Sequence, residues 1–206
     1  MRVNYLGHAC FLLADNQKSV VIDPFKNIGY PLKRVSADFC ACSHFHFDHC
    51  ATEMVDARVI INAQNTHKFD WVKTVNSYHD EVMGFKRGEN LIFKFKIDQF
   101  NVCHLGDLGQ PYNEELCEKI GRVDVLLIPV GSTYTIDAEE AYKYVMKLNP
   151  SIVIPMHYKT PRSTVDIEGK SLFLDMFDRV EKVCAQFEII KLPNEMTVYD
   201  VDDSEF

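Results

Sequence analysis

The sequence lacks any long hydrophobic run. No stretch of the 206 residues reaches the roughly 18 apolar residues that a membrane-spanning helix needs. The first residues, MRVNYLGHACFLL, also lack the charged start, apolar segment and small-residue cleavage site of a secretory signal. We therefore expect a cytoplasmic location and no membrane partner.

A basic surface is missing as well. The chain has 22 Lys and Arg against 30 Asp and Glu, a formal net charge of −8, and no run of basic residues forms a stripe. Binding of nucleic acids relies on basic side chains that neutralise phosphates, so we expect no nucleic-acid partner. An acidic protein can still bind a small anion if bound metal cations make the site locally positive.

Paired or clustered cysteines and linkers are absent too. The seven cysteines are odd in number and scattered, which indicates free thiols in a reducing compartment: Cys10, Cys40, Cys42, Cys50, Cys103, Cys117 and Cys184. No low-complexity tract or linker divides the chain. We expect a single domain over residues 1–206, which should bury about 70% of the surface of its unfolded form.

Short β-branched and apolar runs predict many strands. A turn at residues 15–17 separates two of them, and Asp98-Gln99 separates two others that look like a hairpin. The predicted strands are Arg2–Leu6, Cys10–Leu13, Ser19–Ile22, Phe39–Ser43, Val59–Ile61, Asn90–Ile97, Phe100–His104, Val123–Pro129 and Ile152–Pro155.

Two segments have helical periodicity. Asp137–Leu148 has apolar residues at three- and four-residue spacing, a capping box of Asp137 with Glu140, and a stop at Asn149-Pro150. Ser171–Val183 predicts a second helix by the same spacing. In each half the strands precede the helix, which suggests two similar halves. The last residues, Val201–Phe206, look like a frayed acidic tail.

The strongest motif is the run from Ser43 to His49, with sequence SHFHFDH, which directly follows an apolar strand. In an extended segment His44 and His46 point the same way and can coordinate one ion together. If the chain then turns into a helix, Asp48 and His49 can hold a second ion, with Asp48 favoured by the helix dipole. Imidazole nitrogens and carboxylate oxygens suit Zn²⁺, and Mn²⁺ or Fe²⁺ less selectively.

Two ions need further ligands from other parts of the chain. His79 precedes a glycine-containing loop, Asp107 lies between Gly106 and Gly109, and His157 follows a buried strand. Glycine lets the backbone turn sharply and present the carboxylate. The sequence thus predicts a two-metal site from His44, His46, Asp48, His49, His79, Asp107 and His157.

The remaining histidines have weaker signals. His104 lies three residues before Asp107, which favours a hydrogen-bonding role over direct ligation. His8 and Asp23 are candidates for groups that hold a ligating imidazole, since a carboxylate near such a ring fixes its tautomer. A plain structural hydrogen bond is an equal alternative for both. We assign no role to His67.

These motifs resemble the metallo-β-lactamase-fold hydrolases, and within them the ascorbate-6-phosphate-lactonase-like branch. The shared elements run through nearly the whole chain in order: Gly7-His8-Ala9, Ile22–Phe25, the His-x-His-x-Asp-His motif, an isolated His, a Gly-Asp turn and Ile154–Tyr158. The resemblance implies an α/β four-layer αββα sandwich. It assigns His44, His46 and His79 to one metal and Asp48, His49 and His157 to the other, bridged by Asp107.

The chemistry expected of such a site is metal-dependent hydrolysis. Two divalent ions can lower the pKa of a bridging water to about 7, and the resulting hydroxide would attack an ester-like bond. Asp48 would orient this nucleophile or relay its proton, although ligation alone is equally possible. The expected substrate is a small anionic phosphoester or phosphorylated lactone, with positive charge from Lys159, Arg162 and Lys33 and a hydroxyl from Tyr158.

Three alternatives stay open from the sequence. A single-iron dioxygenase can use the same scaffold, although His46 stands where di-iron relatives typically place a carboxylate. A metal-binding protein without catalysis is the second alternative. RNA processing is the third, and the lack of an added arm or basic patch disfavours it. The substrate, the native metal and the oligomeric state are left undefined.

Overall fold

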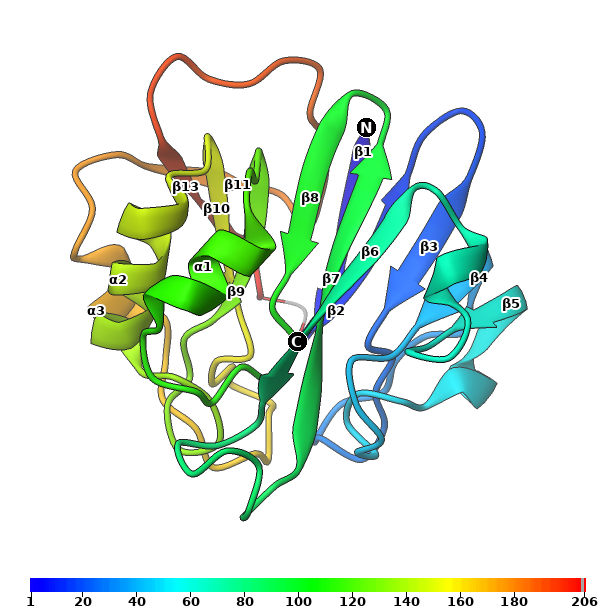
Figure 1. Cartoon of the computed structure of the whole chain (residues 1–206), viewed down its shortest axis with the longest axis horizontal. Helices are drawn as coiled ribbons and strands as arrows, with labels where there is room; N and C mark the ends of the chain where they lie inside the picture. The colour runs from blue at the N-terminus through cyan, green and yellow to red at the C-terminus, as the bar shows by residue number, and fades with distance from the viewer. Residues whose placement is uncertain (205) are drawn as a thin grey trace.

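The computed structural model describes residues 1–204 and 206 and contains two β-sheets (Figure 1). The first sheet has the spatial order β12-β1-β2-β3-β4-β5, and the second has the order β11-β13-β10-β9-β8-β7-β6. The strands of the first are β1 Arg2–Gly7, β2 Cys10–Ala14, β3 Ser19–Ile22, β4 Val35–Ala41, β5 Val55–Ile61 and β12 Gln186–Glu188. Those of the second are β6 Val72–Tyr78, β7 Glu89–Ile97, β8 Phe100–His104, β9 Val125–Pro129, β10 Ile152–Met156, β11 Val180–Val183 and β13 Thr197–Val201.

Local turns and long connections divide each sheet into antiparallel and parallel parts. β1, β2 and β3 are antiparallel neighbours, and β4 and β5 then join in parallel. In the second sheet β6, β7 and β8 are antiparallel, whereas β9, β10, β13 and β11 pair in parallel. The predicted hairpin is confirmed, with Phe93 opposite His104 at one end and Ile97 opposite Phe100 at the other.

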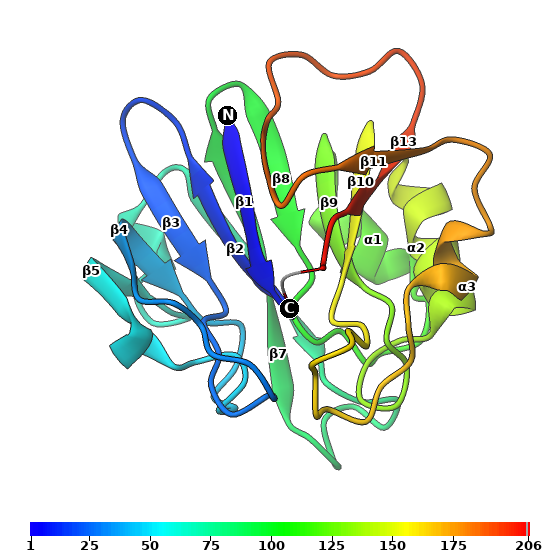
Figure 2. The ribbon, with the colours of Figure 1, turned by 180° about the vertical axis from the view of Figure 1, so that it is seen from behind.

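The two sheets pack face to face, because alternate residues of each strand point into a shared apolar core. In β2, for example, Phe11 and Leu13 join this core, while Cys10 belongs to a second cluster on the other face. Figures 1 and 2 show the helices α1 (Glu114–Ile120), α2 (Ala138–Leu148) and α3 (Ser171–Leu174) on the outer side of the second sheet. The predicted α/β sandwich is confirmed.

The outer face of the first sheet is covered differently. Its apolar side chains pack against Phe25, Ile28, Tyr30 and Leu32, which belong to the irregular segment after β3. Of the two single-turn 3₁₀ helices in the described residues, η1 (Thr52–Met54) contacts β5 of this sheet and η2 (Thr66–Lys68) contacts β6 of the other. The irregular segment after β3 thus covers the outer face of the first sheet, whereas helices cover the outer face of the second. Among the described residues, no helix is long and apolar enough to cross a membrane.

The helix predicted at Asp137–Leu148 is confirmed together with its cap. The Asp137 carboxylate accepts a hydrogen bond of 2.8 Å from the backbone N–H of Glu140. Asn149 adopts the left-handed conformation that commonly ends a helix, with φ of 46°.

The helix predicted at Ser171–Val183 is wrong beyond its first turn. The helix α3 ends at Leu174, and Val180–Val183 forms β11 instead. This strand pairs in parallel with β13, so long-range backbone hydrogen bonds override the local periodicity. The idea of two similar halves is also wrong, because the described α-helices all lie between residues 114 and 174.

The prediction of a frayed acidic tail at Val201–Phe206 is wrong for the described residues, because this end of the chain is packed. Glu205 lies outside the described residues. Val201 is buried in β13, and the Lys170 amino group forms ion pairs of 2.7 Å with Asp200 and 2.8 Å with Asp203. The Phe206 ring lies 5.4 Å from that of Tyr5. Aromatic packing and partly buried ion pairs hold this segment against the sandwich.

Candidate metal centre

The seven predicted ligands come from four separate segments and meet at one edge of the sandwich. Each segment comes within three residues of a strand end: residues 44–49 follow β4, His79 follows β6, Asp107 follows β8 and His157 follows β10. These strand ends gather at the bottom of Figure 1. The topology therefore brings together side chains that are more than 100 residues apart in the chain.

Asp107 lies at the middle of this cluster. Its Oδ2 atom is 3.0 Å from Nε2 of His49, 3.2 Å from Nε2 of His79 and 3.3 Å from Nε2 of His157. Nε2 of His44 is 3.7 Å away. Burial alone would raise the pKa of the Asp107 carboxyl, but the surrounding imidazoles hold it well below its usual value. The carboxylate is thus ionised and shared by donors from every segment.

The donor atoms fall into two main groups around Asp107. His44, His46 and His79 form one, and His8, Asp48, His49 and His157 form the other. Within each group the ligand atoms lie within 4.8 Å of one another, a spacing that could hold one metal ion. His44 and His49 also form a group with Asp107 itself, which lies between the other two.

The segment from His44 to Cys50 is a turn and not the start of a helix. The backbone N–H groups of His49 and Cys50 both donate to the carbonyl of His46, at 3.1 and 2.9 Å. No α-helix follows among the described residues until α1 at Glu114. The suggestion that a helix dipole favours Asp48 is therefore wrong, and the turn alone brings Asp48 and His49 to their positions.

Hydrogen bonds on the far side of the imidazoles aim their Nε2 atoms inward. Asp23 Oδ2 lies 3.0 Å from Nδ1 of His49, and the carbonyl of Tyr134 lies 3.1 Å from Nδ1 of His79. Both partners are acceptors, so each ring donates from Nδ1, and in its neutral form it presents the Nε2 lone pair to a metal ion. Asp23 thus fixes a ring orientation, which is one of the two roles that the sequence left open for it.

His104 has a structural role in the described residues. Its Nε2 atom lies 2.8 Å from the carbonyl of Ala9, and its Nδ1 atom accepts a hydrogen bond of 3.0 Å from the N–H of Gly106. It therefore holds the turn that presents Asp107 rather than pointing at the donors. Gly106 has φ of 58°, and a Cβ there would lie 2.3 Å from Asn90 Oδ1, so this turn needs glycine.

Unpaired buried atoms indicate that the cluster fits metal ions. Seven buried side-chain atoms lack a hydrogen-bond partner among the described residues, and five of them belong to this site: Nε2 of His8, His44 and His49, Oδ1 of Asp107 and Nδ1 of His157. Burying such groups without a partner costs free energy, which a bound cation would offset. Burial also lowers the pKa of His44 to about 3, so its ring is neutral, as a metal ligand must be.

The cluster opens into a cleft that the sequence analysis did not foresee. A cavity of about 660 Å³ exposes His46, Asp48 and His79 and is bordered by Phe45, Phe47, Arg87 and Tyr134. A second cavity of about 450 Å³ adjoins it and shares Phe45, His46 and Arg87. Arg87 is the single Lys or Arg among the described residues lining either cavity.

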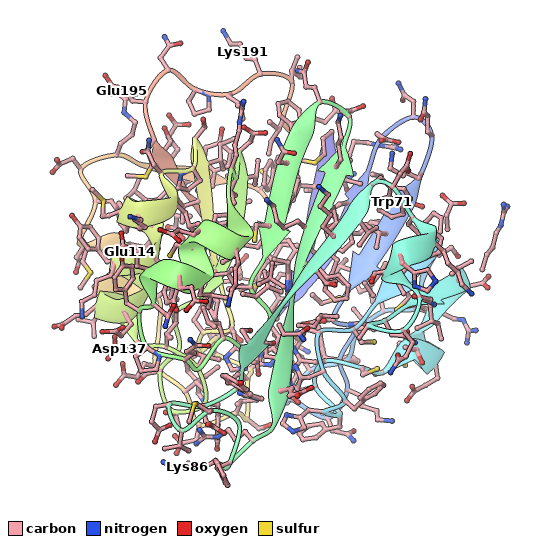
Figure 3. The ribbon with its side chains drawn as sticks, viewed as in Figure 1. Trp71, Lys86, Glu114, Asp137, Lys191 and Glu195 are labelled. Atoms are coloured by element: carbon pink, nitrogen blue, oxygen red, sulfur yellow. The ribbon has the colours of Figure 1, made fainter. Side chains whose placement is uncertain are left out.

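Arg87 is held in place by a compact loop between β6 and β7. The Asp80 carboxylate accepts hydrogen bonds from four backbone N–H groups of this loop, including a bond of 2.8 Å from Arg87. The Arg87 guanidinium lies 5.3 Å from the centre of the Tyr134 ring and donates to the Thr133 carbonyl. Figure 3 shows Lys86 at the tip of this loop, beyond the edge of the sheets.

The basic residues and the tyrosine proposed from the sequence do not line the cleft. Lys33 and Arg162 border a different cavity, next to Tyr30 and Phe206. Lys159 is exposed and donates to the carbonyl of Val165. Tyr158 is buried, and its hydroxyl faces Lys170 instead. The expectation that these four residues line the cleft is therefore wrong. Tyr158 directly follows His157, and successive side chains in extended backbone point in opposite directions, whereas Lys33, Lys159 and Arg162 lie in loops outside the strands.

A two-sheet sandwich with clustered imidazoles and carboxylates at one edge defines a class of metal-binding α/β proteins. The family model of the beta-lactamase superfamily domain matches residues 2–157. A UPF0173 metal-dependent hydrolase from Pelotomaculum thermopropionicum is 33% identical, with the match covering 78% of this chain and 85% of that protein. A relative of the same description from Methanoculleus marisnigri is 31% identical over 78% of this chain and 82% of its own.

Solved structures agree with this assignment. A crystal structure from Thermotoga maritima, described as a Zn-dependent hydrolase of the metallo-beta-lactamase superfamily, has a TM-score of 0.80 and 36% identity, and the match covers 97% of each chain. The chain therefore belongs to the beta-lactamase superfamily, among its metal-dependent hydrolases of the metallo-β-lactamase fold.

Proposed function

We propose that this hydrolase uses two divalent metal ions, Zn²⁺ first and Mn²⁺ or Fe²⁺ as alternatives, to cleave an ester-like bond in a small anionic metabolite. The observation that carries the proposal is the position of Asp107, whose Oδ2 lies within 3.7 Å of imidazoles from both donor groups. A carboxylate in that position suits a bridge between two ions. His44, His46 and His79 would hold one, and Asp48, His49 and His157 the other.

When bound, such ions would lower the pKa of a bridging water to about 7 and so supply hydroxide at neutral pH. The chain contributes orientation and proton handling. Asp48 is partly exposed to the cleft, and its Oδ2 lies 3.5 Å from His8 Nε2 and 3.8 Å from His49 Nε2. It is the carboxylate best placed to orient the attacking group or accept its proton.

Arg87 supports an anionic substrate. Its guanidinium shares the cleft with the metal ligands, and its backbone and side chain are both held by hydrogen bonds. A preorganised guanidinium binds carboxylate or phosphate in a bidentate manner. The adjacent rings of Phe45 and Phe47 are 81% and 54% exposed, so they can cover an apolar part of the same molecule. A phosphoester or a phosphorylated lactone has this combination of groups.

The test combines metal analysis with a substrate panel. We expect purified protein to carry two ions per chain and to hydrolyse a phosphodiester or a lactone, with activity lost on chelation and restored by Zn²⁺ or Mn²⁺. Asp48→Asn, loaded with both ions in metal excess, should lose most of the turnover. Full turnover in that variant would contradict a proton role for Asp48.

Variants of Arg87 test the substrate class. Because a hydrogen bond to a charged group contributes about 1.5–3 kcal/mol, Arg87→Ala should raise KM for an anionic substrate by about 10- to 100-fold with a smaller change in kcat. Lys33→Ala removes a cation from a different cavity and is the matched control. An unchanged KM in Arg87→Ala would contradict an anionic substrate. Metal-replete protein without turnover of any panel member, or iron with oxygen uptake, would overturn the hydrolytic proposal.

A further inference from the structure

His8 is fixed at the bend between β1 and β2, where the strand register shifts near Gly7. Its carbonyl accepts a hydrogen bond of 3.0 Å from the Tyr5 hydroxyl and one of 2.9 Å from the N–H of His157. The residue adopts φ of 55°, a left-handed conformation that is uncommon outside glycine. Such strain costs about 1–3 kcal/mol and persists where the surrounding structure enforces it.

The His8 side chain points into the metal centre. It is only 1% exposed, and its Nε2 atom lacks a hydrogen-bond partner among the described residues. The nearest carboxylate oxygen is Oδ2 of Asp48, at 3.5 Å. The His8 ring centre lies 4.2 Å from that of His157 and 5.1 Å from that of His49. An unpaired buried nitrogen thus faces the same point as three expected ligands.

We propose that His8 is a direct ligand of the second metal ion, together with Asp48, His49 and His157; this inference rests on the metal centre of the proposed function. The four ligand atoms lie within 4.8 Å of one another, so one ion can contact all of them. A cation there satisfies the buried nitrogen of His8 and separates it from the Asp48 carboxylate. The strained backbone at His8 then has a reason, because it aims this ring at the ion.

This ligand makes the two metal positions unequal. With Asp107 shared, the first position has three imidazoles and one carboxylate, a set that suits tetrahedral Zn²⁺. The second has His8, Asp48, His49, His157 and the shared Asp107, which is five protein donors. Five donors favour ions that accept more than four ligands, such as Mn²⁺ or Fe²⁺. We expect the second position to prefer these ions relative to the first.

Direct ligation can be measured without any substrate. In protein labelled with ¹⁵N-histidine and loaded with ¹¹³Cd²⁺, we expect a one-bond ¹¹³Cd–¹⁵N coupling for His8, identified by its loss in His8→Gln. The glutamine side chain can still donate a hydrogen bond to Asp48 but is a poor ligand for these ions. Chelator competition should give at least about tenfold weaker binding at one of the two positions in His8→Gln, with the other position unchanged.

Two further variants make the result decisive. His8→Asn tolerates the left-handed backbone but is too short to reach the ion, so it should weaken the same position. His67→Gln changes an exposed histidine that belongs to none of the donor groups and should change neither affinity. If both ions bind and His8→Gln retains both affinities with no cadmium coupling to His8, then His8 only orients Asp48 and this inference fails alone. If the protein binds no metal ions, the proposed function fails with it.

Discussion

Asp23 contacts both halves of the metal centre through a short chain of hydrogen bonds. Its Oδ2 atom accepts a hydrogen bond of 2.6 Å from the Ser43 hydroxyl and lies 3.0 Å from Nδ1 of His49. The Ser43 hydroxyl has a single proton and donates it in the hydrogen bond to Asp23. It must therefore accept a hydrogen bond from Nδ1 of His44, 2.9 Å away. One carboxylate therefore fixes the tautomers of two imidazoles, one from each donor group.

Asp23→Asn should weaken both metal positions. The asparagine amide cannot accept hydrogen bonds from both Ser43 and His49 in the same way. Loss of such a partner typically lowers metal affinity by about 10- to 100-fold. Ser43→Ala should affect mainly the position that includes His44. Chelator competition with Zn²⁺ measures both, and Asp38→Asn is a matched control, since Asp38 accepts from Ser19 in the same sheet. Wild-type affinity in Asp23→Asn would contradict this role.

The sequence predicted donors that the structure brings together, but it did not predict the cleft beside them. Each donor segment follows a strand, as for His44, His79, Asp107 and His157. Strand ends at one edge of a sheet are neighbours irrespective of the loop conformations. Arg87 had no such signal, because its position depends on the hydrogen bonds that Asp80 makes to its own loop. The sequence indicates at most a supporting role for His8, since it reveals neither the left-handed backbone of this residue nor its distance from Asp48.

At the scale of elements, the turns at the end opposite the metal centre connect the two sheets. Asp15, in the turn between β2 and β3, accepts hydrogen bonds from the N–H groups of Gln17 and Lys18 and from the Lys18 amino group. Its Oδ2 also accepts from the N–H of Asp98, in the turn between β7 and β8 of the other sheet, at 3.1 Å. A single carboxylate thus links two hairpins that are distant in sequence.

Asp15→Ala should destabilise the fold in a pH-dependent way. Burial alone would raise the pKa of Asp15, but its hydrogen bonds, led by that from Asp98, lower it well below the unfolded value of about 3.9. Its stabilising effect is therefore complete above that value and is lost as the pH falls towards the folded pKa. We expect a loss of about 1.5–3 kcal/mol at neutral pH.

Urea unfolding at several pH values measures this effect. The difference between Asp15→Ala and the wild type should be largest near neutral pH and should narrow below about pH 4. The variant Asp56→Ala, at an exposed position of β5, should stay within about 0.5 kcal/mol of the wild type throughout. A difference that is independent of pH would mean that packing, and not the charge of Asp15, links the turns.

The elements that local patterns failed to predict share a physical cause. β11 and β13 depend on each other, since Val180 pairs with Val198 and Val183 with Val201. Residues 171–183 have the spacing of an amphipathic helix, yet Leu172 is 61% exposed and only Phe173 of α3 is fully buried. In contrast, Asp137–Leu148 carries its own cap and stop, so local information was sufficient there.

At the scale of the whole molecule, the chain concentrates its histidines at one edge. Of its eight histidines, six contribute donors to the metal centre and His104 supports the turn before Asp107, which leaves His67. The opposite end of both sheets is closed by tight turns such as that of Asp15. The sandwich therefore gathers at one edge several buried polar atoms that lack a hydrogen-bond partner among the described residues.

Removal of the metal ions should for this reason lower the stability of the entire fold. Each ion that binds only the folded state stabilises it by about 4 kcal/mol when free metal is about 1,000-fold above its Kd. For a chain of this size, each kcal/mol shifts Tm by about 2–4 °C, so chelation should lower Tm by about 8–16 °C for each ion removed. Calorimetry of chelated protein, with Zn²⁺ or Mn²⁺ then restored in excess, measures the shift and its reversal. An unchanged Tm after verified loss of metal would mean that the clustered donors are satisfied without ions, which contradicts a metal centre built from Asp107 and its surrounding imidazoles.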